Sequence, residues 1–111
     1  MPSNALELVA YVFGGAFLAN AIPHLFSGMM GRRFPSPFAK PPGKGQSSAT
    51  INVLWGFGNL VVGYLLIAHV GDFDLRNIED IGALAIGVLL MSVMLSRTFG
   101  GLNGGRGPDL A

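Results

Sequence analysis

The sequence predicts an all-α integral membrane protein, a bundle of three membrane-spanning helices in a single domain over residues 1–111. Only 12% of the residues are charged and 50% are hydrophobic, with a mean hydropathy of +0.53. A soluble domain usually carries about 25% charged residues. The few charges leave three uncharged stretches, Leu8–Gly31, Gly45–Gly71 and Ile81–Ser96. This apolar composition and the lack of Cys exclude a disordered chain, a disulfide scaffold and a cysteine-based metal site.

The first two uncharged stretches are long enough to cross a bilayer. About 20 apolar residues of helix span the hydrocarbon core, and these stretches contain 24 and 27 residues. We expect spans at about residues 5–27 and 51–70. Asn4 has the spacing of a capping box before the first helix, and Ser47 and Ser48 are both suitable caps for the second.

The third helix is long enough to span a membrane only if it includes charged residues at both of its ends. Its uncharged stretch contains only 16 residues, but a helix over 77–99 places Asp80 in the first turn and Arg97 in the last, where the helix dipole favours these charges. Asn77 is the expected cap. Gly100 and Gly101 are expected to end the helix, and the Gly-rich tail 100–111 is expected to be flexible.

The charges also predict an orientation. The loop 28–50 is basic and rich in Pro and Gly, and its four prolines exclude a regular helix. Five of the six acidic residues lie on the other side of the predicted bundle. Because cytoplasmic segments are enriched in Lys and Arg, we expect the N-terminus outside the cell and the C-terminus in the cytoplasm. The side chains expected to contact lipid headgroups are Arg32, Arg33, Lys40 and Lys44.

Polar residues near the cytoplasmic ends of the first two helices predict a notch in the membrane. At about 1.5 Å of rise per residue, Asn20 and Asn59 lie at the same depth. Pro23 lacks an N–H, so it leaves a carbonyl of the first helix without its donor and opens a kink. The predicted lining of this notch is Asn20, Pro23, His24, Ser27, Asn52, Trp55 and Asn59. For His24 the alternatives are a neutral, packed imidazole bonded to Asn52 or to a backbone carbonyl, and a proton-linked or ligand-contacting group.

Small residues predict where the helices pack against one another. Gly56 and Gly63 share the face of the second helix that carries its two asparagines, and Ala83 and Gly87 form a small-xxx-small pair in the third. Such residues let helix backbones approach closely. We therefore expect these four positions to lie between helices.

Three strings of the sequence resemble those of small bacterial inner-membrane proteins without an established activity. They are Asn20-Ala-Ile-Pro-His24, Phe34-Pro-Ser-Pro-Phe-Ala39 and Asn52-Val-Leu-Trp-Gly56. The resemblance covers about residues 14–66. It implies a multi-pass protein of the bacterial inner membrane and identifies no functional residues.

Two functions agree with these observations. The first is a structural or accessory protein that self-associates or joins a larger membrane complex, because three short helices alone bury little surface. The alternative is binding or transport of a small molecule or amphiphile at the notch. We expect no enzymatic activity, since His24 has no carboxylate at its depth with which to form an acid–base pair. We also expect no metal, cofactor or nucleic acid, because one His lies on each side and residues 43–48 lack the spacing of a phosphate loop.

Overall fold

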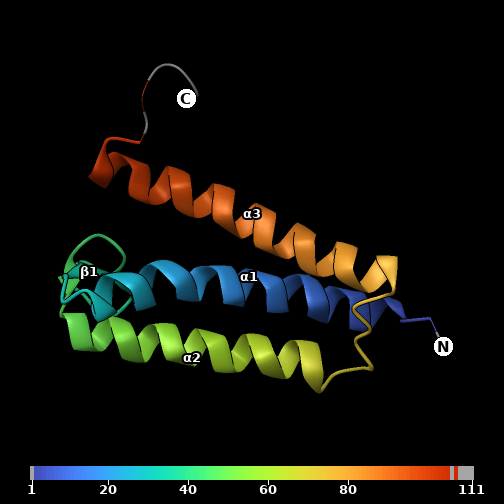
Figure 1. Cartoon of the computed structure of the whole chain (residues 1–111). Helices are drawn as coiled ribbons and strands as arrows, with labels where there is room; N and C mark the ends of the chain where they lie inside the picture. Colours follow the sequence, from blue (N-terminus) through green and yellow to red (C-terminus); the bar gives the residue numbers. More distant parts are fainter. Residues whose placement is uncertain (1, 106, 108–111) are drawn as a thin grey trace.

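The computed structural model describes residues 2–105 and 107 and contains three long helices and one short hairpin (Figure 1). The helices are α1 (Ala5–Met29), α2 (Ala49–Ala68) and α3 (Ile78–Asn103), and the strands are β1 (Phe34–Pro35) and β2 (Gln46–Ser47). Each helix is long and apolar enough to cross a membrane. The prediction of an all-α protein with three such helices is confirmed.

Helix α1 lies between the other two helices (Figure 1). Both α2 and α3 pack along α1, whereas they scarcely contact each other. The molecule is accordingly flat, measuring 45 × 34 × 22 Å. Helix α3 lies close to α1 near its own N-terminus and diverges from it toward its C-terminal end (Figure 1).

Side-chain caps begin all three helices, as predicted. Asn4 and Glu7 form a capping box, in which Asn4 Oδ1 accepts a bond from Glu7 N at 2.8 Å and Glu7 Oε1 accepts one from Asn4 N at 2.9 Å. The Ser48 hydroxyl accepts a bond from Ile51 N at 3.2 Å, and Asn77 caps α3. Each cap satisfies backbone N–H groups that a helix start leaves without partners.

The C-terminal end of α3 differs from the prediction. The helix continues through Gly100 and Gly101 to Asn103 and ends at Gly104, which has a φ of 76°. Only glycine adopts this left-handed conformation without a steric penalty. Glycine is frequent inside membrane helices, so the pair at 100–101 does not stop the helix. The predicted helix end at residue 99 is therefore wrong, and residues 106 and 108–111 of the predicted tail lie outside the described part of the chain.

The connection between α1 and α2 contains an antiparallel hairpin that the sequence analysis did not predict. Phe34 pairs with Ser47 and Pro35 with Gln46. The Ser36 and Ser47 hydroxyls share a hydrogen bond of 2.6 Å behind this pairing. Proline cannot donate to a strand ladder, which keeps the hairpin short.

Small residues occupy the two helix interfaces. Gly56, Gly63, Ala83 and Gly87 are all buried, as expected of packing positions. A Cβ atom added to Gly56 would lie 2.7 Å from Cγ of Leu25 in α1. The α1–α2 and α1–α3 interfaces therefore depend on close approach of the helix backbones.

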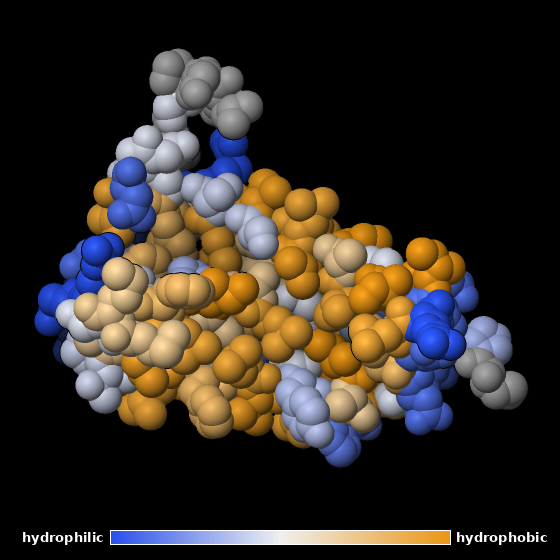
Figure 2. Space-filling view, in the orientation of Figure 1, coloured by the Kyte–Doolittle hydropathy of each residue, from blue (hydrophilic) through white to orange (hydrophobic). Residues whose placement is uncertain are grey.

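Hydrophilic residues gather mainly at the two ends of the molecule, with a hydrophobic band between them (Figure 2). The start of α1 and the end of α3 lie at opposite ends (Figure 1). We call the end with the α1–α2 connection the basic end and the opposite end the acidic end. The basic end contains Arg32, Arg33, Lys40 and Lys44, and the acidic end contains Glu7, Asp72, Asp74, Glu79 and Asp80.

Candidate functional site

A buried histidine–asparagine pair links α1 to α2 near the basic end. His24 is 3% exposed and Asn52 is fully buried, and His24 Nδ1 lies 2.8 Å from Asn52 Oδ1. The other side of the Asn52 amide, Nδ2, donates toward the carbonyl oxygens of Phe34 (2.9 Å), Ser47 (3.3 Å) and Ser48 (3.1 Å). This pair therefore joins the helices to the hairpin and to the start of α2.

Three aromatic rings surround the imidazole of His24. The ring centroids of Phe34, Trp55 and Phe99 lie 5.5, 6.3 and 6.3 Å from that of His24, all in edge-to-face geometry. Phe34 and Phe99 also contact each other, with centroids 4.6 Å apart. These rings come from β1, α2 and α3, so every part of the basic end contributes to the surroundings of His24.

Two neighbouring hollows lie beside His24. The first, which we call the imidazole pocket, has a volume of about 170 Å³. Its lining residues are Asn20, His24, Pro35, Ser36, Pro37, Gly43, Trp55, Thr98 and Phe99. The second, which we call the α1–α3 cleft, has a volume of about 410 Å³. Its lining residues are Ala19, Ile22, Pro23, Phe34, Ser92, Leu95, Ser96, Phe99 and Asn103.

The predicted notch corresponds in part to these hollows. Asn20, His24 and Trp55 line the imidazole pocket, and Pro23 lines the α1–α3 cleft. Ser27 is half-buried and lines neither hollow among the described residues. The structure therefore has two neighbouring hollows, the imidazole pocket and the α1–α3 cleft, where the sequence predicted a single notch.

Asn59 lies behind the pocket and supports it. Asn20 Nδ2 donates to Asn59 Oδ1 at 2.9 Å, which confirms the predicted pairing across the α1–α2 interface. Asn59 Nδ2 in turn donates to the Trp55 carbonyl oxygen at 2.8 Å. Asn52 and Asn59 therefore hold the residues that reach the pocket, and neither of them lines it.

Residues of β1 and α3 also surround His24, and they were not predicted from the sequence. Phe34 and Phe99 were outside the predicted notch because the hairpin was not expected and the predicted helix over 77–99 was not placed beside His24. One signal was available in α3. Ser92, Phe99 and Asn103 recur at helical spacing and so share one face, which is the face that lines the cleft.

The basic side chains of the α1–α2 connection are exposed. Arg32, Arg33, Lys40 and Lys44 all reach the surface of the basic end. Arg33 also donates from Nη2 to the Gln46 carbonyl oxygen at 2.7 Å and so braces β2. These positions suit contact with acidic lipid headgroups, the role expected for them.

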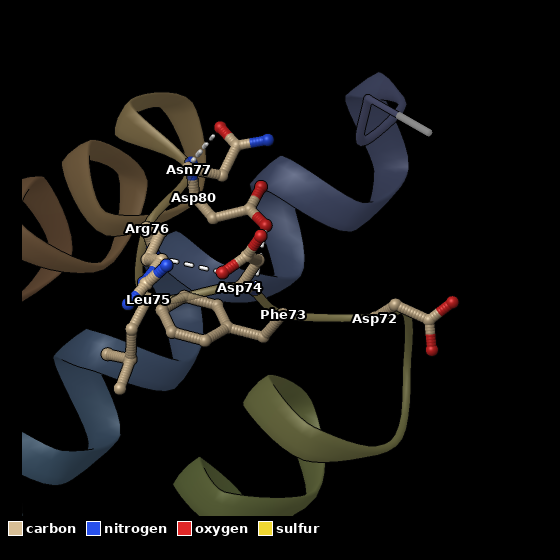
Figure 3. Close-up of a pocket in the computed structure, with 7 residues that line it drawn as sticks. All are labelled: Asp72, Phe73, Asp74, Leu75, Arg76, Asn77 and Asp80. Atoms are coloured by element: carbon tan, nitrogen blue, oxygen red, sulfur yellow. Dashed lines mark hydrogen bonds between the residues drawn. The ribbon is translucent and has the colours of Figure 1, made fainter.

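A hollow larger than either of these lies at the acidic end and is built differently (Figure 3). It measures about 640 Å³ and lies beside the segment between α2 and α3. Asp80 is 1% exposed and accepts bonds from the Ser3 hydroxyl at 2.6 Å and from Asp74 N at 3.0 Å. Asp72 points away from these groups (Figure 3). The buried carboxylate here fastens the N-terminal segment and the α2–α3 connection to α3.

Two further polar groups lie toward the acidic end. The Tyr11 hydroxyl is enclosed without a hydrogen-bond partner among the described residues, and its ring meets that of Phe73 edge-on at 4.9 Å. His69 follows α2, and its Nε2 atom lies 3.4 Å from the Tyr64 hydroxyl oxygen. Within the described chain no three His, Asp or Glu residues are grouped to hold a metal ion.

Comparisons with protein-family models, with curated proteins and with solved structures found no match to this chain, so its function is inferred from the geometry of the basic end.

Proposed function

We propose that this chain is a three-span protein of the bacterial inner membrane that binds a small amphiphile at its basic end. The polar head occupies the imidazole pocket and the apolar chain extends into the α1–α3 cleft. The observation that carries this proposal is a buried imidazole that lines a small pocket, which shares the ring of Phe99 with a larger apolar cleft. Ligand sites usually combine an apolar lining with a few polar groups that fix orientation.

The position of the cleft favours a ligand that arrives through the bilayer. Its walls belong to the lengths of α1 and α3 that are apolar enough to span a membrane. The two helices diverge at this end (Figure 1), and residues of both line the cleft. Phe99 lines both hollows and joins the cleft to the pocket.

Quenching of tryptophan fluorescence tests the binding, because Trp55 lines the pocket and is the only Trp in the chain. The protein in phosphatidylcholine nanodiscs is titrated with dodecanol and with dodecanoate, each brominated on the carbon next to the head. We expect saturable quenching by at least one of the two. Quenching that rises only in proportion to the bromine in the bilayer would contradict the proposal.

A matched pair of variants separates the cleft from the lipid surface. Ser92 is exposed and lines the cleft, whereas its neighbour Val93 is 50% exposed and does not. Ser92→Phe fills the cleft and is expected to weaken saturable quenching at least tenfold. Val93→Phe adds the same ring outside the cleft and is expected to leave quenching unchanged. Equal effects of both variants would place the ligand elsewhere.

The proposed orientation puts the basic end in the cytoplasm, because six of the seven basic residues lie in the loop 28–50 or near the C-terminus. The chain contains no Cys, so a single introduced thiol gives an unambiguous signal. Lys44→Cys is expected to react with a membrane-impermeant maleimide only after the cytoplasmic side is opened. Asp72→Cys is expected to react in intact cells whose outer membrane is permeabilised. The reverse pattern would invert the topology.

Self-association is the second candidate function, and the isolation of α3 favours it. Of the other two helices, α3 packs along α1 and scarcely contacts α2, and only 17% of its most apolar stretch is buried. A second copy or a larger membrane complex would cover more of that surface. Leu90→Cys, at a position 62% exposed, should then form disulfide-linked dimers in native membranes. A monomer at every protein-to-lipid ratio would refute this candidate.

A further inference from the structure

We infer that the head of the bound amphiphile is an uncharged hydroxyl group, and that a head with two neighbouring hydroxyls binds best. This inference rests on the proposed function and concerns the chemistry of the same pocket. It follows from two chains of hydrogen bonds that both end at the imidazole pocket in an acceptor.

The first chain ends at His24. The three carbonyl oxygens around Asn52 Nδ2 only accept, so they fix the amide nitrogen on their side and the amide oxygen on the side of His24. An amide oxygen accepts as well, and therefore His24 Nδ1 carries the hydrogen of their 2.8 Å bond. In a neutral imidazole the other nitrogen is then an acceptor.

That second nitrogen is available to a ligand. His24 Nε2 forms no hydrogen bond with any described residue. It is also not fully enclosed, because Tyr11 Oη is the one fully enclosed side-chain polar atom without a partner among the described residues. His24 lines the imidazole pocket, whereas its partner Asn52 does not. We therefore assign the pocket-facing edge of the ring to Nε2.

The second chain ends at Asn20 by the same reasoning. The Trp55 carbonyl oxygen fixes Nδ2 of Asn59 as the donor, so Asn59 presents its oxygen to α1. Asn20 Nδ2 donates to that oxygen at 2.9 Å, which leaves Asn20 Oδ1 as the free group of a residue that lines the pocket. Asn20 and His24 are one helical turn apart, at a spacing of about 5–6 Å between Cβ atoms. Two vicinal hydroxyls are well placed to donate to both acceptors.

The charge of the pocket excludes an ionic head. Apart from His24, whose imidazole is taken as neutral, none of the described residues that line it is acidic or basic. A carboxylate would be buried opposite two lone pairs, and an ammonium group would be buried without a counter-ion. Burying an unpaired charge is far more costly than burying a hydroxyl group that forms hydrogen bonds. A methyl ether has no hydrogen to donate and would leave both acceptors without partners.

Competition against the brominated dodecanol tests the head group directly. Nanodiscs carrying that probe receive unlabelled twelve-carbon competitors, compared at equal mole fraction in the bilayer: the vicinal diol, the alcohol, the methyl ether, the carboxylate and the amine. We expect the diol to displace the probe best and the alcohol next. The ether is expected to be at least tenfold weaker than the diol, since each hydrogen bond contributes about fivefold.

Two variants assign the effect to its residues. His24→Phe keeps a flat ring but removes the acceptor, so it is expected to abolish the preference for alcohol over ether. Asn20→Leu has nearly the same shape and is expected to abolish the preference for diol over alcohol, which keeps the inference testable if His24→Phe does not fold. Ser27→Ala, on the same helix and away from both hollows, is the control and should change neither preference.

The outcomes distinguish this inference from the proposed function. Saturable quenching with the carboxylate or amine as the best competitor, or with the ether equal to the alcohol, overturns the inference and leaves amphiphile binding intact. Retention of both preferences in both variants also overturns it. Absence of saturable quenching by either brominated probe overturns the proposed function and the inference together.

Discussion

Replacing Gly87 by Ala is expected to push α3 away from α1. A Cβ atom at this position would overlap the Val12 carbonyl oxygen, and it would lie 2.7 Å from the Val12 carbonyl carbon and 3.1 Å from Ala16 N. These are backbone atoms of α1, which cannot rotate away as a side chain could. The overlap is therefore relieved only by separating the two helices.

The size of the effect follows from a comparison within the same helix. Gly82 also lies in α3, but a Cβ atom there would meet nothing within 4 Å. Gly82→Ala and Gly87→Ala both gain about 1 kcal/mol of helix propensity. The difference between the two variants therefore isolates the overpacking cost, which is about 1–3 kcal/mol. We expect a value near the upper limit, about 3 kcal/mol, because the obstructing atoms are backbone.

Energy transfer between dyes measures this difference. The chain has no native Cys, so Phe13→Cys on α1 and Leu90→Cys on α3 carry the two dyes at positions that are 56% and 62% exposed. The fraction of SDS in mixed micelles is raised until the transfer is lost. Gly87→Ala is expected to separate at a lower SDS fraction than Gly82→Ala. Equal midpoints would refute the close approach of α1 and α3.

Three further predictions concern single contacts. Asp80→Ala removes the acceptor of the Ser3 and Asp74 bonds and should destabilise the acidic end by about 1–3 kcal/mol. Limited proteolysis between α2 and α3 should accelerate, while exposed Glu79→Ala should not change it; equal rates would argue against a fastening role. Asn59→Ala breaks one interhelical bond and should cost only about 0.6 kcal/mol in an SDS titration of the α1–α2 pair, so a loss several times larger would contradict that assignment. Gly104→Ala places a Cβ on a residue with a φ of 76° at a cost of about 1–2 kcal/mol, and amide exchange near the end of α3 should become faster; unchanged exchange would count against this cap.

The distribution of charges was sufficient to predict the helices. Water-exposed ends need charged residues and a bilayer core excludes them, so the gaps between charges predicted where the three long apolar helices lie. A rise of about 1.5 Å per residue placed Asn20 at the same depth as Asn59. The hydrogen bond between the two side chains confirms this prediction. The His24–Asn52 bond was one of the alternatives open from the sequence, and the structure forms it.

The arrangement of the helices around α1 was harder to predict, because three apolar helices have no polar face that identifies their neighbours. A Cβ on Gly14 would meet Ile67 of α2 at 2.6 Å, whereas one on Gly15 would overlap the Leu84 carbonyl of α3. Two consecutive glycines thus serve two different interfaces. The hairpin escaped prediction for another reason: its pairing depends on the Asn52 amide reaching back to the Phe34 carbonyl oxygen, a contact across 18 positions that no local pattern signals.

The central position of α1 also has a consequence for how the protein is made. Chains emerge from the ribosome N-terminus first, so α1 and α2 can pair, with both of their asparagine contacts in place, before α3 has been synthesised. Phe99, the ring shared by both hollows, belongs to the last helical turns. A nascent chain that stalls before these turns carries an assembled helical hairpin with one wall of its cavity missing, and translation of the final segment completes the enclosure.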